Sequence, residues 1–146
     1  MATAVVSFRV SEEQAKRLQR KARQLGRSPS ETGAILLDEG LRRDEFAFID
    51  FRDSAVGRQA CIQGTRLAVW QVVSLARSYS GDVKKIADHL EWPPVKVQAA
   101  LNYAAAFPEE IESAIRDSQS YDFAKISRIL PQAEEFVLPS GTRKKK

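Results

Sequence analysis

Few residues of this sequence could act as catalysts. The chain has one histidine, His89, and one cysteine, Cys61. His89 falls in an apolar-periodic helix without an evident serine or cysteine partner, and Cys61 follows Ala60 in an expected strand, where a small buried residue is commoner than a reactive thiol. The aspartates show no arrangement at strand ends that would gather them around magnesium: Asp50, Asp53, Asp82 and Asp88. One histidine and one cysteine are also too few for a zinc site. We therefore expect no enzyme, no cofactor and no metal.

Residues suited to recognition lie near the N-terminus. From position 5 to position 10 apolar and polar side chains alternate, which is the pattern of a strand with one buried face. Val6, Phe8 and Val10 share the face that we expect to be buried. The other face carries Val5, Ser7 and Arg9. An arginine on the wet face of a strand is often only exposed surface, but Arg9 could also pair with guanine through two hydrogen bonds.

Two capped helices follow this strand. Ser11 is the expected N-cap of the first, with Gln14 at capping-box spacing, and Gly26 ends it. Its apolar positions recur every three or four residues, and its opposite face is basic: Lys16, Arg17, Arg20, Lys21 and Arg23. Ser28 opens the second helix, with Pro29 at the first helical position and Glu31 closing a second capping box. Its apolar stripe is formed by Leu36, Leu37 and Leu41.

A lone strand and two helices of this length need a second copy. About 40 residues cannot bury enough apolar surface, and a solitary strand leaves its backbone unpaired. Antiparallel pairing across a two-fold axis would cover Val6, Phe8 and Val10 with four helices and leave the other face of the ribbon for the major groove. Gly33 and Gly40, seven residues apart on one helix face, fit either close helix approach in the dimer or simple tolerance.

Residues 3–43 resemble the ribbon-helix-helix family. The resemblance rests on "VVSFRV", "SEEQAKRLQRKARQLGRSPSET" and "LLDEGLRR". It implies that Val5, Ser7 and Arg9 contact base edges in DNA. It also implies that the amides at Ser28 and Ser30, at the positive end of a helix dipole, hold a phosphate.

The middle of the chain predicts a small helical unit. An apolar cluster at residues 46–51 indicates a packed connection, and Gly64 indicates a short hairpin or tight turn that leads into a helix at about 69–79. Asp82 is the expected cap of a further helix, and a break at 91–94 separates it from the next one, which gives the outline of a helix-turn-helix. Lys96, Gln98 and Asn102 could reach nucleic acid, although helical hairpins are common in unrelated folds.

This middle segment resembles domain-of-unknown-function family 433. The motifs are "GRQACIQGTRLAVWQVVSL", with its Gly-Thr-Arg turn, and "GDVKKIADHLEWPPVKVQAALNYAAAFPEEIE". The resemblance implies an antitoxin domain of the VapB type, paired with a PIN-like toxin. Arg66 in the turn could face a phosphate or a carboxylate, but a structural bond to a nearby carbonyl or acid is the favoured expectation. Trp70 and Trp92 are expected in the core or at a dimer contact.

The C-terminal segment carries apolar groups with little polar cover. They either dock on a toxin or pack on the chain's own middle domain. The candidate toxin-binding residues are Tyr121, Phe123, Ile126, Leu130 and Phe136. The closing Arg-Lys-Lys-Lys run adds at most unspecific attraction to nucleic acid.

Together these patterns predict a mainly α protein with three parts. Residues 1–46 form a ribbon-helix-helix unit that dimerises by a swapped two-stranded ribbon, residues 47–116 a helix-turn-helix-like antitoxin domain with a short β-hairpin, and residues 117–146 a tail. Basic residues exceed acidic ones at both ends and not in the middle, and no run is long enough to span a membrane. We expect a cytoplasmic repressor that binds operator DNA as a homodimer or higher even oligomer and neutralises a PIN-like ribonuclease toxin. The alternatives are a stand-alone transcriptional or partition regulator and a purely structural adaptor.

Overall fold

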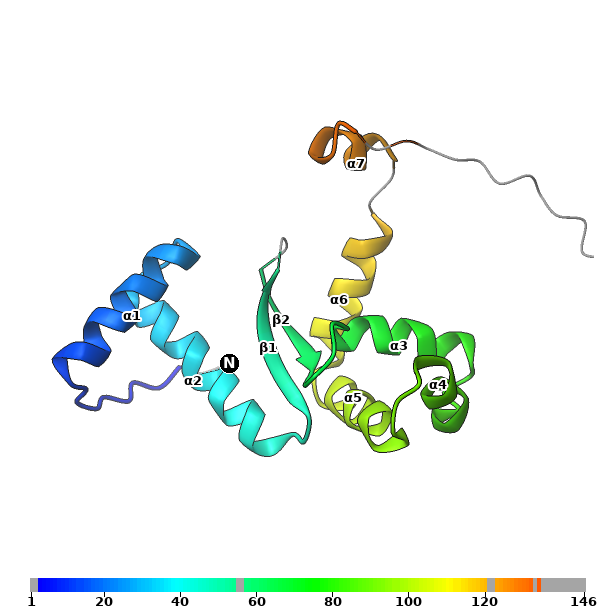
Figure 1. The fold of residues 1–146 in the computed structure, drawn as a ribbon. Helices are drawn as coiled ribbons and strands as arrows, with labels where there is room; N and C mark the ends of the chain where they lie inside the picture. Colours follow the sequence, from blue (N-terminus) through cyan, green and yellow to red (C-terminus); the bar gives the residue numbers. More distant parts are fainter. Residues whose placement is uncertain (1–2, 55–56, 121–122, 133, 135–146) are drawn as a thin grey trace, which may run out of the picture.

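The protein is a mainly helical chain that contains a β-hairpin. The computed structural model describes residues 3–54, 57–120, 123–132 and 134 (Figure 1). The elements are α1 (Glu12–Leu25), α2 (Pro29–Glu45), β1 (Ile49–Ser54), β2 (Gly57–Ile62), α3 (Val69–Ser78), α4 (Val83–Leu90), α5 (Pro94–Ala106), α6 (Pro108–Gln119) and α7 (Phe123–Ile129).

The boundaries of α1 and α2 follow the capping signals of the sequence. The Ser11 hydroxyl accepts from the Gln14 amide at 3.2 Å, and the Gln14 side chain accepts from the Ser11 amide at 3.0 Å. Gly26 ends α1 in the left-handed conformation at φ 65°, which glycine adopts without a steric penalty. Ser28 caps α2 through the Glu31 amide at 3.1 Å. The second capping box is incomplete, because the Glu31 carboxylate lies 3.7 Å from Arg27 instead.

The β-hairpin lies earlier in the chain than expected. β1 and β2 pair antiparallel, from Ile49 opposite Ile62 to Ser54 opposite Gly57. The connection expected at residues 46–51 therefore contains the start of β1. Phe46 and Phe48 stand just before this strand and obscure its alternation of apolar and polar residues. The expected turn at Gly64 exists as well, but only an isolated bridge between Cys61 and Ala68 flanks it.

The main core lies between the hairpin and helices α3, α5 and α6. Its fully buried members include Ile62, Val69, Val72 and Tyr103. Figure 1 shows these helices on one side of the hairpin and the α1–α2 pair on the other, and α2 packs against β1. The hairpin thus joins the two parts of the molecule.

The predicted helix pair α4–α5 is confirmed. Asp82 caps α4 by accepting from the Lys85 amide at 3.2 Å, and Glu91 ends it in the left-handed conformation. A second buried cluster holds the pair on α3: Ala76, Ile86, Ala87 and Val97. Trp92 is half-buried against both clusters and Trp70 against the main one, as expected of core residues. The sequence did not indicate α6 as a separate helix.

The described residues form neither a membrane-spanning helix nor a metal-binding cluster. Within the described ranges, no helix combines the length and apolarity needed to cross a membrane. Across the same residues, no three histidine, cysteine or acidic side chains come together as metal ligands would.

Candidate nucleic-acid interface

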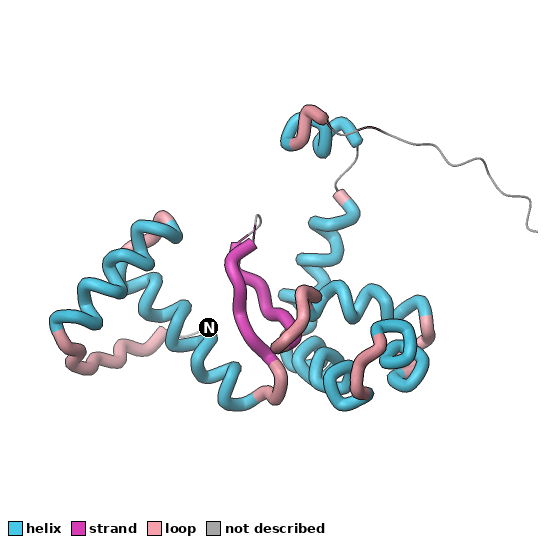
Figure 2. The backbone as a smooth tube through the Cα atoms, in the orientation of Figure 1, coloured by secondary structure: helices cyan, strands magenta, loops and turns pink. Residues whose placement is uncertain are grey.

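The segment before α1 is the first part of the candidate interface. Residues 3–11 form neither helix nor strand in the single chain, and Figure 2 shows them as a loop. The strand expected at residues 5–10 is therefore absent from the single chain, where the only described sheet consists of β1 and β2. Val5 is 99 % exposed and Phe8 is 70 % exposed, so the segment contributes nothing to the core. Pairing with a second copy stays a prediction.

The side chains of this segment are all open to solvent. Ser7 and Arg9 are exposed, and so are Val6 and Val10 on the opposite face. The single chain therefore leaves both the expected base-reading face and the expected dimer face uncovered.

The N-terminus of α2 is the second part. The Ser28 side chain is occupied by its cap bond, but no described group accepts from the backbone amides of Ser28 or Ser30. Both residues are exposed. These amides are free to meet a phosphate, although the neighbouring Glu31 carboxylate opposes an anion there.

One face of α2 has no partner in the part of the chain that the structure describes. Leu37 is 48 % exposed and Leu41 is 52 % exposed. A Cβ added at Gly40 would meet no atom within 4 Å, whereas one at Gly33 would touch Leu18 of α1 at 3.9 Å. The two glycines thus differ: Gly33 lies beside α1 of its own chain, and Gly40 lies in open space on the uncovered face.

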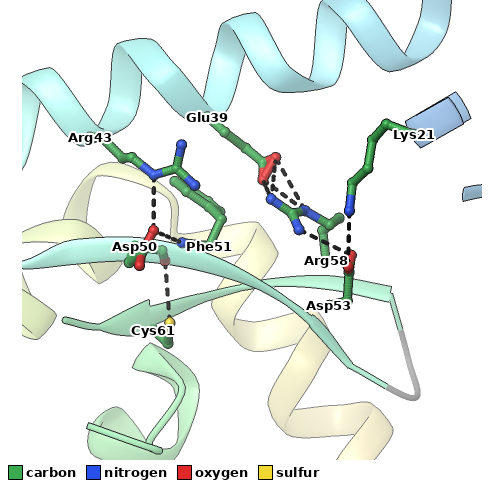
Figure 3. A network of polar contacts seen from close by, with 8 residues as sticks. All are labelled: Lys21, Glu39, Arg43, Asp50, Phe51, Asp53, Arg58 and Cys61. Carbon is green, nitrogen blue, oxygen red and sulfur yellow. Dashed lines mark hydrogen bonds and ion pairs between the residues drawn. The ribbon is translucent and has the colours of Figure 1, made fainter. Parts of the chain in front are cut away.

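The opposite side of α2 is fastened to the hairpin by ion pairs (Figure 3). Glu39, which is buried, accepts from the Arg58 guanidinium through several bonds, including one from Nε to Oε1 at 2.8 Å. Arg58 also donates to Asp53 at 3.0 Å, and Lys21 of α1 reaches the same carboxylate at 3.0 Å. Burial by itself would lower the pKa of Arg58. The hydrogen bonds that Arg58 donates to Glu39 and Asp53 outweigh this effect, so the pKa is raised.

A further pair lies nearer the start of β1. The Asp50 carboxylate accepts from the Phe51 backbone amide at 2.8 Å and from Arg43 Nε at 2.9 Å. The pKa of Asp50 is lowered, first by the amide bond and then by Arg43, against an opposing effect of burial. Cys61 donates to the Asp50 carbonyl at 3.5 Å, and burial raises the pKa of its thiol. Cys61 is therefore a buried thiol, as expected.

The end of α2 is also tied to α5 and α6. Arg42 donates to the Tyr103 hydroxyl at 2.7 Å and to Glu110 at 2.9 Å, and its guanidinium lies 3.8 Å from the centre of the Phe107 ring. The buried Tyr103 hydroxyl donates to Glu110 at 2.6 Å. Burial and the Glu110 carboxylate raise the pKa of Tyr103. These bonds make α2 a shared element of both parts of the molecule.

The sequence did not reveal these bridging residues. Glu39 carries the best retrospective signal, because it lies four residues after Ile35 and seven before Phe46, on the inward side of α2. A charged residue at such a position indicates a buried ion pair, but the sequence does not indicate that its partner is Arg58.

The second candidate contact lies around the turn at Gly64. Arg66 is exposed, and no hydrogen bond or ion pair joins it to another described residue, so the favoured expectation of a structural bond is wrong. Lys96 Nζ approaches the Gln63 carbonyl at 3.4 Å. Gln98 donates to Asn102 at 2.9 Å along α5 and stays exposed.

The candidate toxin-binding residues are only partly placed. Tyr121 and Phe136 lie outside the described residues. Phe123 and Ile126 belong to α7, which Figure 1 shows apart from the main core beyond α6. Leu130 is 48 % exposed.

The comparison with known families covers the middle of the chain. Residues 49–104 match a family described as "protein of unknown function (DUF433)", from β1 to the last turn of α5. This confirms the family resemblance of that segment. No similar protein was found among curated proteins or among solved structures.

Proposed function

We propose that this protein is an antitoxin-like transcriptional repressor of the VapB type, in which a ribbon-helix-helix dimer binds operator DNA and a C-terminal segment neutralises a PIN-like ribonuclease toxin. One observation carries the proposal. Among the described residues eight large apolar side chains are exposed, and six of them lie within residues 5–41. They are Val5, Val6, Phe8, Val10, Leu37 and Leu41.

A second copy is the cover that best fits this arrangement. The apolar groups lie on an extended segment and on one face of α2, so two copies could pair their segments antiparallel and pack their α2 helices together. Gly40 leaves room for close approach of the partner helix. Antiparallel pairing of the two segments would place Val6, Phe8 and Val10 inside the dimer.

The same pairing would leave Ser7 and Arg9 on the outer face of a two-stranded ribbon. Such a ribbon fits the major groove, where arginine can donate two hydrogen bonds to guanine. The exposed basic face of α1 adds attraction for the phosphate backbone: Lys16, Arg17, Arg20 and Arg23. The toxin-binding role rests on the family resemblance of residues 49–104 and on the exposed Leu130 in the C-terminal segment.

The DNA-binding half is tested with the full chain and the DNA upstream of its own gene. Arg9→Ala is expected to lower the preference for this DNA over a random duplex by about thirty- to twenty-thousand-fold, because the dimer loses two bidentate base contacts of about 1–3 kcal/mol each. Arg23→Ala is the matched control, because it removes the same charge from an exposed position on α1. It should weaken both complexes alike. Binding that keeps its specificity in Arg9→Ala would overturn the ribbon assignment.

The toxin-binding half is tested by copurification with the product of the neighbouring reading frame. An acid-rich nuclease-like protein should copurify with the wild-type chain and be lost in Leu130→Asp. Gln132→Asp, at an exposed position nearby, is the control and should retain it. Specific DNA binding without any such partner would instead favour the stand-alone regulator.

A further inference from the structure

The turn at residues 63–66 is built as a rigid platform. The Thr65 hydroxyl donates to the Ile62 carbonyl at 2.9 Å and accepts from the Leu67 amide at 3.2 Å. The Ile62 amide donates to the Leu67 carbonyl at 3.1 Å, which closes the turn across its base. Gly64 holds φ 78°, a conformation that glycine adopts without strain. The backbone that carries Arg66 is therefore fixed by bonds that do not involve its side chain.

Arg66 is unusual among the arginines of its region. Of the six arginines from residue 42 to residue 106, Arg42, Arg43, Arg58 and Arg77 form ion pairs with carboxylates. Arg52 lies near Asp50 and the Cys61 thiol. Arg66 alone has no acidic partner among the described residues. Its guanidinium offers five donors in a planar fork that matches a phosphate or a carboxylate.

Lys96 adds a second cation to the same turn. Its ammonium group lies 3.4 Å from the Gln63 carbonyl, and a Cβ at Gly64 would be 3.7 Å from it. One bond to a carbonyl leaves two of its three donors for a ligand. The two segments that form this surface contain no acidic residue at all, neither 57–81 nor 92–108. Their own sequence therefore offers these two cations no counter-charge.

We propose that Arg66 and Lys96 form a contact for the phosphate backbone of duplex DNA, separate from the ribbon of residues 5–10. The two cations can reach phosphates without any element entering a groove. The contact therefore carries no base specificity. The inference stands independently of the repressor proposal. A phosphate contact at the turn requires neither the two-stranded ribbon nor a toxin.

The test measures how the affinity of the full chain for a labelled random-sequence duplex depends on salt. Each phosphate contact contributes about −0.9 to the slope of log K against log salt concentration. Arg66→Ala and Lys96→Ala are each expected to make the slope shallower by about 0.9 and to weaken binding about five- to ten-fold near 0.1 M salt. Arg66→Lys keeps the charge and should keep most of the slope.

The matched control is Arg77→Ala. It removes the same charge from the other end of the same acid-free segment, where Arg77 pairs with Glu112. Its slope should stay within about 0.3 of the wild-type value, since a charge that makes no phosphate contact releases no counterion. The proposal is overturned by Arg66→Ala behaving like this control, or by a wild-type chain that does not bind the duplex.

Arg9→Ala separates this inference from the repressor proposal. Unchanged specificity in Arg9→Ala together with a shallower slope in Arg66→Ala would overturn the ribbon and keep the phosphate contact. The reverse pattern would keep the ribbon and overturn the contact.

Discussion

The N-terminal helix pair, α1 and α2, differs from the hairpin domain, which runs from β1 to α6, in how far its apolar residues are buried. In the hairpin domain the side chains of Ile62, Val69, Val72 and Tyr103 are fully buried within one chain. Among the described apolar residues from position 3 to the end of α2, only Ala22 is buried, and Phe8 lies open to solvent. One part completes a core within the chain, and the other leaves large apolar side chains exposed.

The charges divide differently, between α1 and the elements that follow it. Arg42 and Arg43 of α2 and Arg58 of the hairpin are bound to carboxylates, whereas most cations of α1 are exposed and unpaired among the described residues. Paired charges fix one element against another, and unpaired cations remain available to a polyanion. Paired charges thus fasten α2 to the hairpin and to α6, and α1 keeps exposed cations.

The sharpest way to break this comparison is Phe8→Asp. If Phe8 is buried in a dimer, each copy loses about 1.5–3 kcal/mol of apolar burial, or about 3–6 kcal/mol for the pair. The dimer dissociation constant should rise by roughly a hundred- to ten-thousand-fold, as measured by analytical ultracentrifugation. Val5→Asp places the same charge on the expected outer face and should leave the dimer intact. An unchanged association constant in Phe8→Asp would contradict the two-fold ribbon.

Glu39→Ala tests the buried ion pair that joins α2 to the hairpin. It leaves Arg58 with Asp53 alone, so we expect a loss of about 3 kcal/mol in the free energy of unfolding, the low end for breaking a buried pair because the Arg58 side chain stays 19 % exposed. Urea denaturation measures this loss. Replacing both partners by leucine should recover much of it, since no buried charge is then left unpaired. Lys21→Ala, at the exposed end of the network, should cost less than about 1 kcal/mol.

The smallest expected effect is the pH dependence that the Asp50 carboxylate gives to the free energy of unfolding. Its folded-state pKa is lowered below the unfolded value of about 3.9, so the ionised carboxylate stabilises the fold above that pH, and the contribution is lost as the pH falls through the folded pKa. The side chain is 39 % exposed, which limits the contribution to less than about 1 kcal/mol.

The measurement compares urea midpoints at pH 7 and pH 3. Asp50→Asn should narrow the difference between the two midpoints relative to the wild-type chain. Asp88→Asn, at an exposed position on α4, should leave that difference as it is. An Asp50→Asn protein with the full wild-type acid sensitivity would show that this carboxylate is not bonded in the folded state.

Much of the local structure follows from the sequence. Ser11, Gly26, Ser28 and Asp82 mark helix boundaries that the structure confirms, because caps and left-handed turns depend on residues adjacent in the chain. The hairpin was misplaced because Phe46 and Phe48 stand just before β1 and obscure its alternation. Strand pairing depends on distant residues, and a short apolar run does not specify it.

The candidate site divides in the same way. The alternating pattern of residues 5–10 identifies two faces, and the structure leaves both exposed, so the dimer and its DNA contacts stay predictions. For Arg66 the sequence located the turn but favoured a structural bond. Only the structure showed that no described acid or carbonyl meets the guanidinium, because that depends on which segments fold beside the turn.

The sequence by itself determined where α1, α2 and α4 begin, which positions are apolar, and that the middle of the chain resembles a known family. Those properties depend on neighbouring residues and on periodicity. The tertiary structure decided that α2 is shared between the two parts, through Glu39 with Arg58 and Arg42 with Tyr103. These partners are separated by 19 and 61 positions in the chain, so only the folded path of the backbone brings them within bonding distance.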